Sequence, residues 1–388
     1  MKNLLYICSR FPYPLEKGDK LRAFHQIKDL SKNFNIHLVS FTREDLSTEN
    51  IKQLEPYTST CRIFKTGSEF YWNIIKNGLK GTPFQLSFFQ NKEAKKYVKN
   101  LVKEQNIDLC FNQLIRVADY SKDLDIPKAL DYMDVLSVGV ERQSKHKAFP
   151  LSLLYKIESK RLSKYEAQLA PQYNLKYIIS EQDLALLPEE VIKDTSVLVN
   201  GVDDSFFEEY KSEKKYDICF VGNMSYPPNV LACKFIVNKI LPILKKHKPD
   251  IKVLLAGASP VKEVKDLVNE NVIISGWMDD IREAYASSSI FIAPLFIGTG
   301  LQNKLLEAMA MKTPCITTSL CNNALQALKD EEILIADNEK EFSSHILKLL
   351  NNKGFGEQMA NKAQNMVRKS YNWKTLTDKL AEDLNNLI

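Results

Sequence analysis

Two glycines and a threonine open the stretch GTGLQNKLLEAMA at 298–310, directly before an amphipathic run. The glycines permit close backbone approach, and a helix predicted from about Gln302 would direct its first N–H groups toward the turn. Such a helix start carries partial positive charge and suits a phosphate. Lys304 adds a full charge, and Glu307 offers a carboxylate to ribose hydroxyls. The alternative is an ordinary glycine-rich turn followed by a solvated lysine and glutamate.

Two carboxylates lie close together in the segment Asp131-Tyr132-Met133-Asp134, at the end of a predicted strand over 128–131. A neighbouring negative charge raises the pKa of a carboxyl group and suits it to base work or hydroxyl binding. Asp134 is the candidate base or orienting group, and we expect Asp131 to be structural. The alternative for Asp134 is the N-cap of the following helix.

A third candidate segment follows the first predicted strand, where Gly18-Asp19 precedes a helix that carries Arg22. The residues alone predict a plain structural turn with solvated basic residues. Further along, Glu158, Arg161 and Glu166 have the spacing of a salt-bridged helix surface.

Short β-rich runs alternate with longer helical patterns along the chain. The predicted strands are 4–8, 37–41, 108–112, 128–131, 176–180, 196–199, 218–221, 252–256, 272–275, 290–293 and 315–317, and prominent helices are 20–32 and 93–104. This alternation predicts parallel sheets covered by helices on both faces. Ligands of such sheets bind beyond the carboxyl ends of the strands.

The length of 388 residues favours two domains. Asn200-Gly201 and the polar stretch EEYKSEKKYD mark the division. We expect an N-terminal domain over 1–198, a C-terminal domain over 199–372, and a final helix over 373–388 that crosses back to the N-terminal domain.

The composition restricts the partners. The net charge of +5, from 53 basic and 48 acidic residues, is too small to predict a nucleic-acid partner. The seven cysteines form no C-x-x-C pair, and the five histidines lack ligand spacing, so we expect no metal site and a reduced, cytoplasmic protein. We find neither a signal peptide nor an apolar run long enough to span a bilayer.

The 298–310 stretch, together with NGVD at 200–203, FVGNM at 220–224 and SGWMDDIREAYASSSIFIAP at 275–294, resembles GT-B glycosyltransferases of the family-4 type. Through RFPYPLEKGDKLRAFH at 10–25 and the D-x-x-D at 131–134, the whole chain is similar to sugar transferases found with bacterial exopolysaccharide gene clusters. The resemblance implies an α/β GT-B fold, in which two doubly wound Rossmann-like domains face each other across a cleft. The N-terminal domain would bind the acceptor and the C-terminal domain a nucleotide-diphosphate sugar, which is a substrate, with no cofactor or metal. The segment with Gly18, Asp19 and Arg22 matches the glycine-rich loop that lines the donor and acceptor cleft in this family.

The family's donor site can be carried over residue by residue. Of a pair of family glutamates separated by seven residues, Glu307 matches the second, which holds the ribose, whereas Thr299 stands in place of the first. Asn223 replaces the usual arginine of the pyrophosphate pair, and Pro228-Asn229 occupies the neighbourhood of the lysine. We therefore expect Lys304 and the helix start to stabilise the leaving group. The donor-binding residues implied are Gly222, Asn223, Gly276, Trp277, Met278, Thr299, Gly300, Leu301, Gln302 and Glu307. For Trp277, packing between the domains is the alternative.

The resemblance implies transfer of a hexose-like sugar, with retention of anomeric configuration, to a glycan or lipid-linked glycan of the cell surface. Asp134 stands where many family members have a histidine, which leaves a base-assisted inverting route open. The missing glutamate and the missing arginine and lysine pair favour a non-catalytic GT-B scaffold subunit as the alternative. A sugar-nucleotide epimerase of this fold would need its own acid and base set, which the sequence lacks.

Residues 70–105 carry seven lysines and two acids among interleaved aromatic residues. If the aromatics are exposed, the segment favours peripheral contact with the inner face of an anionic membrane. If they are core residues, the lysines are merely solvated.

Overall fold

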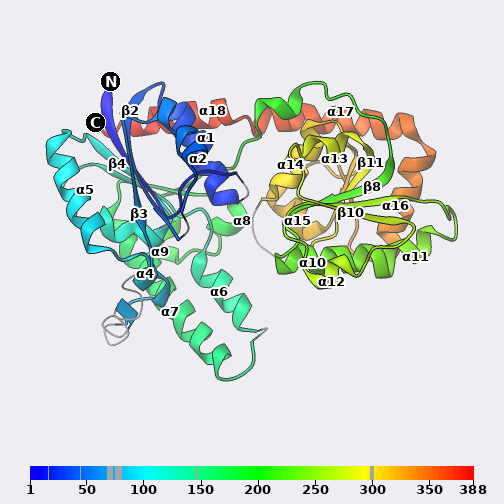
Figure 1. Cartoon of the computed structure of the whole chain (residues 1–388), viewed down its shortest axis with the longest axis horizontal. Helices are drawn as coiled ribbons and strands as arrows, with labels where there is room; N and C mark the ends of the chain where they lie inside the picture. The colour runs from blue at the N-terminus through cyan, green and yellow to red at the C-terminus, as the bar shows by residue number, and fades with distance from the viewer. Residues whose placement is uncertain (16, 44, 68–72, 75–80, 146, 298–300) are drawn as a thin grey trace. The chain divides into compact units, whose positions relative to one another are not determined.

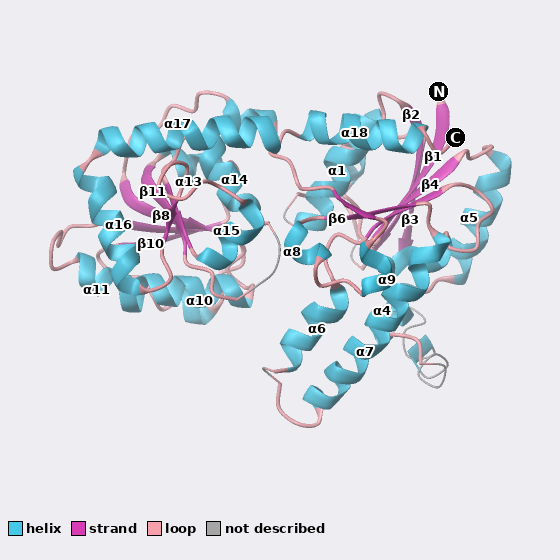
Figure 2. Cartoon of the chain, turned by 180° about the vertical axis from the view of Figure 1, so that it is seen from behind, coloured by secondary structure: helices cyan, strands magenta, loops and turns pink. Residues whose placement is uncertain are grey.

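The computed structural model describes every residue except 16, 44, 68–72, 75–80, 146 and 298–300. Backbone contacts divide the chain into two compact units (Figures 1 and 2). Unit 1 comprises Met1–Val199 and Trp373–Ile388, and unit 2 comprises Asn200–Asn372.

Unit 1 is built on a seven-stranded, fully parallel sheet with the order β3-β2-β1-β4-β5-β6-β7. Its strands are β1 (Lys2–Cys8), β2 (Phe34–Thr42), β3 (Thr60–Lys65), β4 (Leu109–Gln113), β5 (Lys128–Asp131), β6 (Leu175–Ile178) and β7 (Thr195–Val197). Alternate residues of β1 enter different cores, with Leu4 and Tyr6 in one and Leu5 and Ile7 in another. Both faces of the sheet are therefore covered, as the continuous apolar run of a parallel strand predicts.

The helices of unit 1 include its C-terminal segment. They are α1 (Gly18–Leu30), α2 (Thr48–Lys52), α4 (Phe84–Phe89), α5 (Lys92–Glu104), α6 (Leu136–Ser144), α7 (Leu151–Leu169), α8 (Glu181–Leu184), α9 (Glu189–Ile192) and α18 (Trp373–Asn385). Leu380 and Leu384 of α18 are fully buried in the same core as Ile27 of α1. The imidazole of His25 stacks on Trp373 with ring centroids 4.9 Å apart, so α1 and α18 pack side by side.

Unit 2 holds a six-stranded, fully parallel sheet with the order β10-β9-β8-β11-β12-β13. Its strands are β8 (Tyr216–Val221), β9 (Val253–Ala256), β10 (Val272–Gly276), β11 (Ser288–Ala293), β12 (Cys315–Thr317) and β13 (Leu334–Ile335). Its helices are α10 (Pro227–Phe235), α11 (Leu241–Leu244), α12 (Lys262–Lys265), α13 (Arg282–Ala286), α14 (Asn303–Ala310), α15 (Ser319–Leu325), α16 (Glu339–Asn351) and α17 (Lys353–Ser370).

Each sheet has one point where the strand order reverses direction. In unit 1 the reversal lies between β1 and β4, and in unit 2 it lies between β8 and β11. In doubly wound sheets the loops after two such strands leave toward opposite sides, and ligands bind in the crevice between them. The topology therefore directs attention to the residues after β1 and β4, and to those after β8 and β11.

Candidate functional sites of the two units

Lys304 lies in the first turn of α14, which follows β11 at the reversal point of unit 2. Its side chain is half-buried, and its Nζ donates a hydrogen bond of 2.7 Å to Oδ1 of Asn229. The same Nζ stands 4.7 Å from the ring centroid of Phe220 in β8. Burial lowers the pKa of Lys304 to about 8, although Glu307 nearby opposes the change. The structure thus holds a desolvated ammonium group beside a helix N-terminus, where a bound anion would restore its full charge.

Gly222 allows this approach. A Cβ atom at position 222 would lie 2.9 Å from Nζ of Lys304 and 2.6 Å from Nδ2 of Asn229. Gly257 packs behind it with φ of +139°, and a Cβ there would lie 1.9 Å from the carbonyl oxygen of Gly222. Gly257 therefore lets the ends of β8 and β9 pack closely, and Gly222 leaves room for the lysine.

Asn223 is engaged within its own turn. Its Oδ1 accepts hydrogen bonds from the backbone N of Ser225 at 2.9 Å and from its hydroxyl at 2.7 Å. Its carbonyl oxygen accepts from Nδ2 of the buried Asn229 at 2.8 Å. The side chain expected to meet the donor thus shapes the turn, and Asn229, which sequence reasoning noted only as a substitute for the missing lysine, holds Lys304 in place.

Glu307 follows Lys304 by one turn of α14, and its side chain is half-buried. Its Oε2 accepts a 2.7 Å hydrogen bond from the hydroxyl of Tyr285, a fully buried residue of α13. Burial raises the pKa of Glu307, whereas the Tyr285 hydrogen bond and Lys304 oppose that rise. Tyr285 fixes one carboxylate oxygen and leaves the other as an acceptor for a ligand hydroxyl.

Four of the expected donor-binding residues lie directly before α14. Thr299 and Gly300 lie outside the described residues. Leu301 is buried, and Gln302 occupies the N-cap position, so α14 begins one residue later than the sequence predicted.

Gly276 is the last residue of β10, the edge strand of the sheet, and has φ of +68°, and Trp277 and Met278 follow it. Trp277 is 62% exposed, and its Nε1 donates to Oδ1 of Asp279 at 3.2 Å. Trp277 thus does not pack into the core of unit 2, and packing between the domains remains the alternative to a nucleobase contact.

In unit 1, Asp134 follows β5 and is exposed to solvent. The preceding Met133 has φ of +62°, in the left-handed region that disfavours a bulky side chain. Leu114, directly after the neighbouring β4, has φ of +70°. Two non-glycine residues are thus strained side by side at the carboxyl edge of the sheet, a feature that is concentrated at functional sites.

Charged groups surround Asp134. Partial desolvation by the surrounding protein raises the pKa of Asp134 to about 6, and the carboxylates of Asp183 and Asp19 add to the rise, whereas Arg116 opposes it. The N-cap residue of α6 is Val135, whose side chain makes no capping hydrogen bond, and Glu166 accepts the hydrogen bond from the first-turn N–H of Ser137. The N-cap alternative for Asp134 is therefore wrong. The Asp134 carboxyl group is thus tuned to change protonation near neutral pH, as a general base requires.

Asp19 lies in the first turn of α1, after Gly18, and pairs with Arg10 through a 2.6 Å contact. Its carbonyl oxygen accepts from Nε2 of Gln113, the last residue of β4, at 3.0 Å. Arg116 donates from Nε to Gln85 at 3.2 Å, and burial lowers its pKa. Gly18 and Asp19 thus begin α1 and do not form a loop before it, contrary to the sequence prediction. Arg10 and Arg116 carry charge close to Asp19 at the reversal point of unit 1, and the sequence assigned them no role.

Arg22 is not a ligand-facing residue, contrary to expectation. Its side chain is fully buried, and its Nε contacts Oδ2 of the equally buried Asp131 at 2.6 Å. The Arg22 guanidinium also donates to the carbonyl oxygen of Val199 at 3.1 Å. Arg22 faces the sheet because α1 packs this side of the helix onto β5, and the pair gives Asp131 the structural role that the sequence predicted.

The interpretation of Glu158 and Glu166 as a helix surface is also wrong, because both are buried. Glu158 accepts hydrogen bonds from the backbone N atoms of Phe84 and Gln85 at 2.7 and 2.9 Å, at the start of α4. Glu166 accepts from the hydroxyl of Ser137 at 2.6 Å, and burial raises its pKa to about 7. Both carboxylates anchor α7 to its neighbours.

The described aromatic residues of 70–105 pack inward. Phe89 is buried, Phe84 lies under the guanidinium of Arg161, and Tyr97 packs edge-on against Phe64. These contacts do not provide an exposed aromatic face, whereas Phe70, Tyr71 and Trp72 lie outside the described residues.

No cluster of three or more His, Cys, Asp or Glu side chains among the described residues could ligate a metal ion. Within the same residues, no helix combines the length and the apolar character needed to cross a bilayer. The seven cysteines are all free thiols, and six of them are buried.

Comparisons with known proteins agree with this geometry. The family model of glycosyl transferases group 1 matches residues 215–352, the part of unit 2 that contains Gly222, Lys304 and Glu307. A Klebsiella pneumoniae protein, described as an uncharacterized 44.6 kDa protein in the cps region, is 23% identical over 393 residues, covering 96% of this chain and 97% of that protein.

Solved structures match over the full length. Sucrose-phosphate synthase from Thermosynechococcus elongatus superposes with a TM-score of 0.72 at 14% identity, covering 100% of this chain and 99% of that one. HepE from Anabaena, in complex with UDP and glucose, superposes with a TM-score of 0.70 at 14% identity, covering 99% and 100% of the two chains. Residues 215–352 are therefore a glycosyl transferase group 1 domain, in a chain that has the two-domain GT-B fold of glycosyltransferases.

Proposed function

We propose that this protein transfers a sugar from a nucleotide diphosphate to a glycan or lipid-linked glycan acceptor. In this proposal unit 2 binds the donor and unit 1 binds the acceptor. The observation that carries it is the position of Lys304, in the first turn of α14, held by Asn229 and approached closely by Gly222 at the reversal point of the sheet.

Transfer breaks the bond between the anomeric carbon and the diphosphate oxygen, so negative charge grows on the leaving diphosphate. A preorganised cation and a helix N-terminus stabilise such charge without reorganising during the reaction. Lys304 supplies the cation, and α14 supplies the partial positive charge. The loss of the family's arginine at position 223 is compatible with this arrangement, because Asn223 instead shapes the turn that positions Asn229.

Glu307 is proposed to bind the ribose of the donor. Its second oxygen accepts from a ribose hydroxyl while Tyr285 holds the first. The loop from Gly276 to Met278 is proposed to meet the nucleobase, and the exposed indole of Trp277 offers a surface for stacking. HepE is a fold relative whose structure contains UDP, which makes UDP-sugars the first donors to test.

Asp134 is proposed to orient or deprotonate the acceptor hydroxyl. A pKa of about 6 keeps its carboxyl ionised at neutral pH and still basic enough to accept a proton. The family resemblance supports transfer of a hexose with retention. Base catalysis by Asp134 would instead give inversion, so the anomeric configuration of the product, measured by NMR, decides between the two routes.

We further propose that the product belongs to cell-surface polysaccharide synthesis on the cytoplasmic side of a membrane. The similarity to a protein of a cps region supports the first part, and the buried free thiols are compatible with a reducing compartment. The reaction is proposed to need neither a cofactor nor a bound metal, and addition of a chelator should leave the rate unchanged.

The test is binding of, and turnover with, a panel of UDP-, GDP- and CDP-sugars by the native chain and by Lys304→Ala and Glu307→Ala. Lys265→Ala is the matched control, because Lys265 is an exposed lysine of the same unit. We expect both site variants to lose turnover and the control to keep it. The assignment fails if no donor binds or reacts, or if both site variants react at the native rate.

A non-catalytic scaffold subunit is the second candidate, favoured by the local engagement of Asn223. A scaffold subunit would neither hydrolyse a nucleotide sugar nor transfer its sugar, whether or not it binds one. This result should hold even when cell lysate from a glycan-producing bacterium supplies the acceptors. Detection of a Lys304-dependent glycosylated product would exclude it.

A further inference from the structure

Large apolar side chains are exposed together at one end of unit 1. They belong to the turn between α6 and α7 and to the first half of α7, and they comprise Phe149, Leu151, Leu153, Leu154 and Ile157. Phe149 is 82% exposed and Leu153 is 50% exposed. In both views α6 and α7 extend away from the seven-stranded sheet, and the turn that joins them lies at the far end (Figures 1 and 2). We call residues 147–157 the hairpin tip.

The charges of this hairpin are unusual for the chain. Residues 136–169 contain seven basic and three acidic residues, a net charge of +4, whereas the whole chain of 388 residues carries only +5. Two of the three acids, Glu158 and Glu166, are buried and accept hydrogen bonds from the protein interior. All five lysines of the hairpin are exposed, and Glu141 is its one exposed acid. The solvent-facing charge is therefore almost entirely positive.

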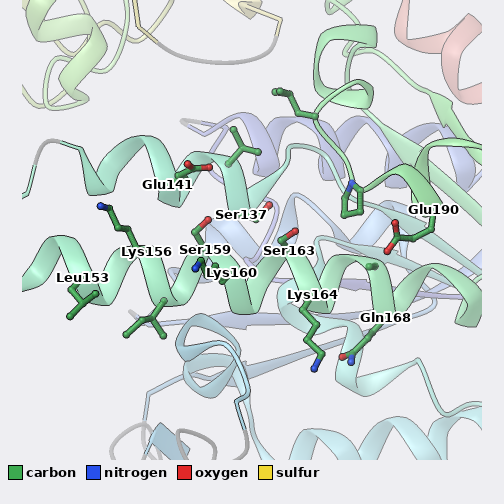
Figure 3. A pocket seen from close by; sticks show the side chains of 15 residues that line it. Ser137, Glu141, Leu153, Lys156, Ser159, Lys160, Ser163, Lys164, Gln168 and Glu190 are labelled. Atoms are coloured by element: carbon green, nitrogen blue, oxygen red, sulfur yellow. The ribbon is translucent and has the colours of Figure 1, made fainter.

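Three of these lysines form a row. Lys156, Lys160 and Lys164 are spaced four residues apart on α7, and they line a groove beside α6 (Figure 3). Glu141 and Glu190 line other parts of the same groove. Like charges four residues apart repel each other on a helix, so the row does not stabilise α7. An external anionic surface would compensate the repulsion.

An apolar tip bordered by lysines matches the anionic face of a lipid bilayer. Phe and Leu side chains can enter the boundary between headgroups and acyl chains, while lysines stay at the level of lipid phosphates. A protein partner of mixed charge would be matched by a surface with both basic and acidic residues. A second copy of the chain would bring an equally positive hairpin, and the two hairpins would repel each other. The charge pattern therefore favours a membrane.

We propose that the α6–α7 hairpin docks unit 1 onto an anionic lipid surface, with the hairpin tip inserted and the lysine row against lipid phosphates. The hairpin tip exposes its apolar side chains, whereas the described aromatics of 70–105 pack inward and Phe70, Tyr71 and Trp72 lie outside the described residues. The inference rests on the fold and charges of unit 1, so vesicle binding without any donor tests it separately from the proposed transfer reaction.

The experiment is co-sedimentation of the full chain with phosphatidylcholine vesicles, with and without phosphatidylglycerol, at low and high salt. The tip variant is Phe149→Ser with Leu153→Ser, and the row variant is Lys156→Gln with Lys160→Gln. Their matched controls lie in unit 2. Leu328→Ser replaces an exposed leucine, and Lys262→Gln with Lys265→Gln replaces two exposed lysines. Circular dichroism melting checks that each variant is folded.

We expect the native chain to bind vesicles that contain phosphatidylglycerol and to release them at high salt. Each hairpin variant should bind at least about tenfold more weakly, because either apolar contact or charge is reduced. The controls should bind as the native chain does. The proposal is overturned if the native chain ignores phosphatidylglycerol or if the folded hairpin variants bind normally. It is also overturned if the tip only drives self-association, seen as a concentration-dependent dimer that the tip variant abolishes.

Discussion

Replacing Lys304 by methionine tests the proposed donor site most directly, because it removes the charge and keeps the length of the side chain. Removing one preorganised donor to a developing anion typically lowers kcat by roughly 10²–10³-fold. Since Lys304 is the described ammonium group nearest the start of α14, we expect a loss in this range. The assay is steady-state transfer from the donor identified in the panel, with Lys265→Met as the matched control.

The lowered pKa of Lys304 adds a pH signature. Only the ammonium form can neutralise the diphosphate, so kcat/KM of the native enzyme should fall as the pH rises through about 8. A bound diphosphate favours the charged form, so the corresponding fall in kcat should occur at higher pH. Both falls should be missing from Lys304→Met.

Stability separates loss of chemistry from loss of structure. The pKa falls from 10.5 in the unfolded chain to about 8 in the folded one. The folded state is therefore penalised below pH 8, where both states are charged, and the penalty is relieved as the pH rises from about 8 to 10.5. This destabilisation of the folded state is at most about 3 kcal/mol, and replacing Lys304 by methionine removes it. The same replacement loses the hydrogen bond to Asn229, which costs about 1 kcal/mol. Lys304→Met should thus unfold at no lower urea concentration than the native chain at pH 7. A folded variant that keeps the native rate and the native alkaline fall would refute the reasoning.

Three other substitutions give distinct results. Tyr285→Phe removes a hydrogen bond of about 1 kcal/mol from Glu307, so donor KM should rise about fivefold with a smaller change in kcat, measured by initial rates; an unchanged KM would argue against a ribose contact. Asp134→Asn should lower kcat by roughly 10²–10⁴-fold and abolish the rise in activity as the pH increases through about 6, where the base ionises. A native pH profile in that variant would remove Asp134 as the base. Asp131→Ala leaves a buried guanidinium unpaired and should lower the free energy of unfolding by about 3–5 kcal/mol in urea titrations, whereas a surface role would change it by less than about 0.5 kcal/mol.

Much of the fold follows from local sequence patterns. The strands over 128–131 and 315–317 were predicted with the bounds that the structure has, because each is a short run in the middle of a parallel sheet. The sequence reading missed β3, an edge strand with the sequence TCRIFK, whose charged residues interrupt the apolar run. It also missed β13, which has only two residues. Weak strands such as these form because neighbouring strands offer hydrogen bonds, which a local pattern does not reveal.

The residues of the proposed donor site also divide into those that local sequence patterns predict and those that they do not. Lys304 and Glu307 could be paired from sequence because helical spacing places them on one face. Tyr285 and Asn229 could not be assigned as their partners, since they lie 22 and 75 residues away along the chain. Arg22 was misassigned for a related reason. A basic residue near a helix start is usually solvated, and its buried partner Asp131 is 109 residues away.

The two units use different backbone solutions to expose chemical groups at the reversal points of their sheets. In unit 2, Gly222 and Gly257 let the strand ends approach Lys304 without steric cost. In unit 1, Leu114 and Met133 adopt positive φ although each has a bulky side chain, at a cost of about 1–3 kcal/mol per residue. The strain is held by pairing across strands, because Leu114 donates its N–H to Asp131 and Ile179 donates its N–H to the Met133 carbonyl. A plain structural turn would gain from glycine at these positions. The bulky residues are explained if their buried side chains fix the chain direction that presents Asp134.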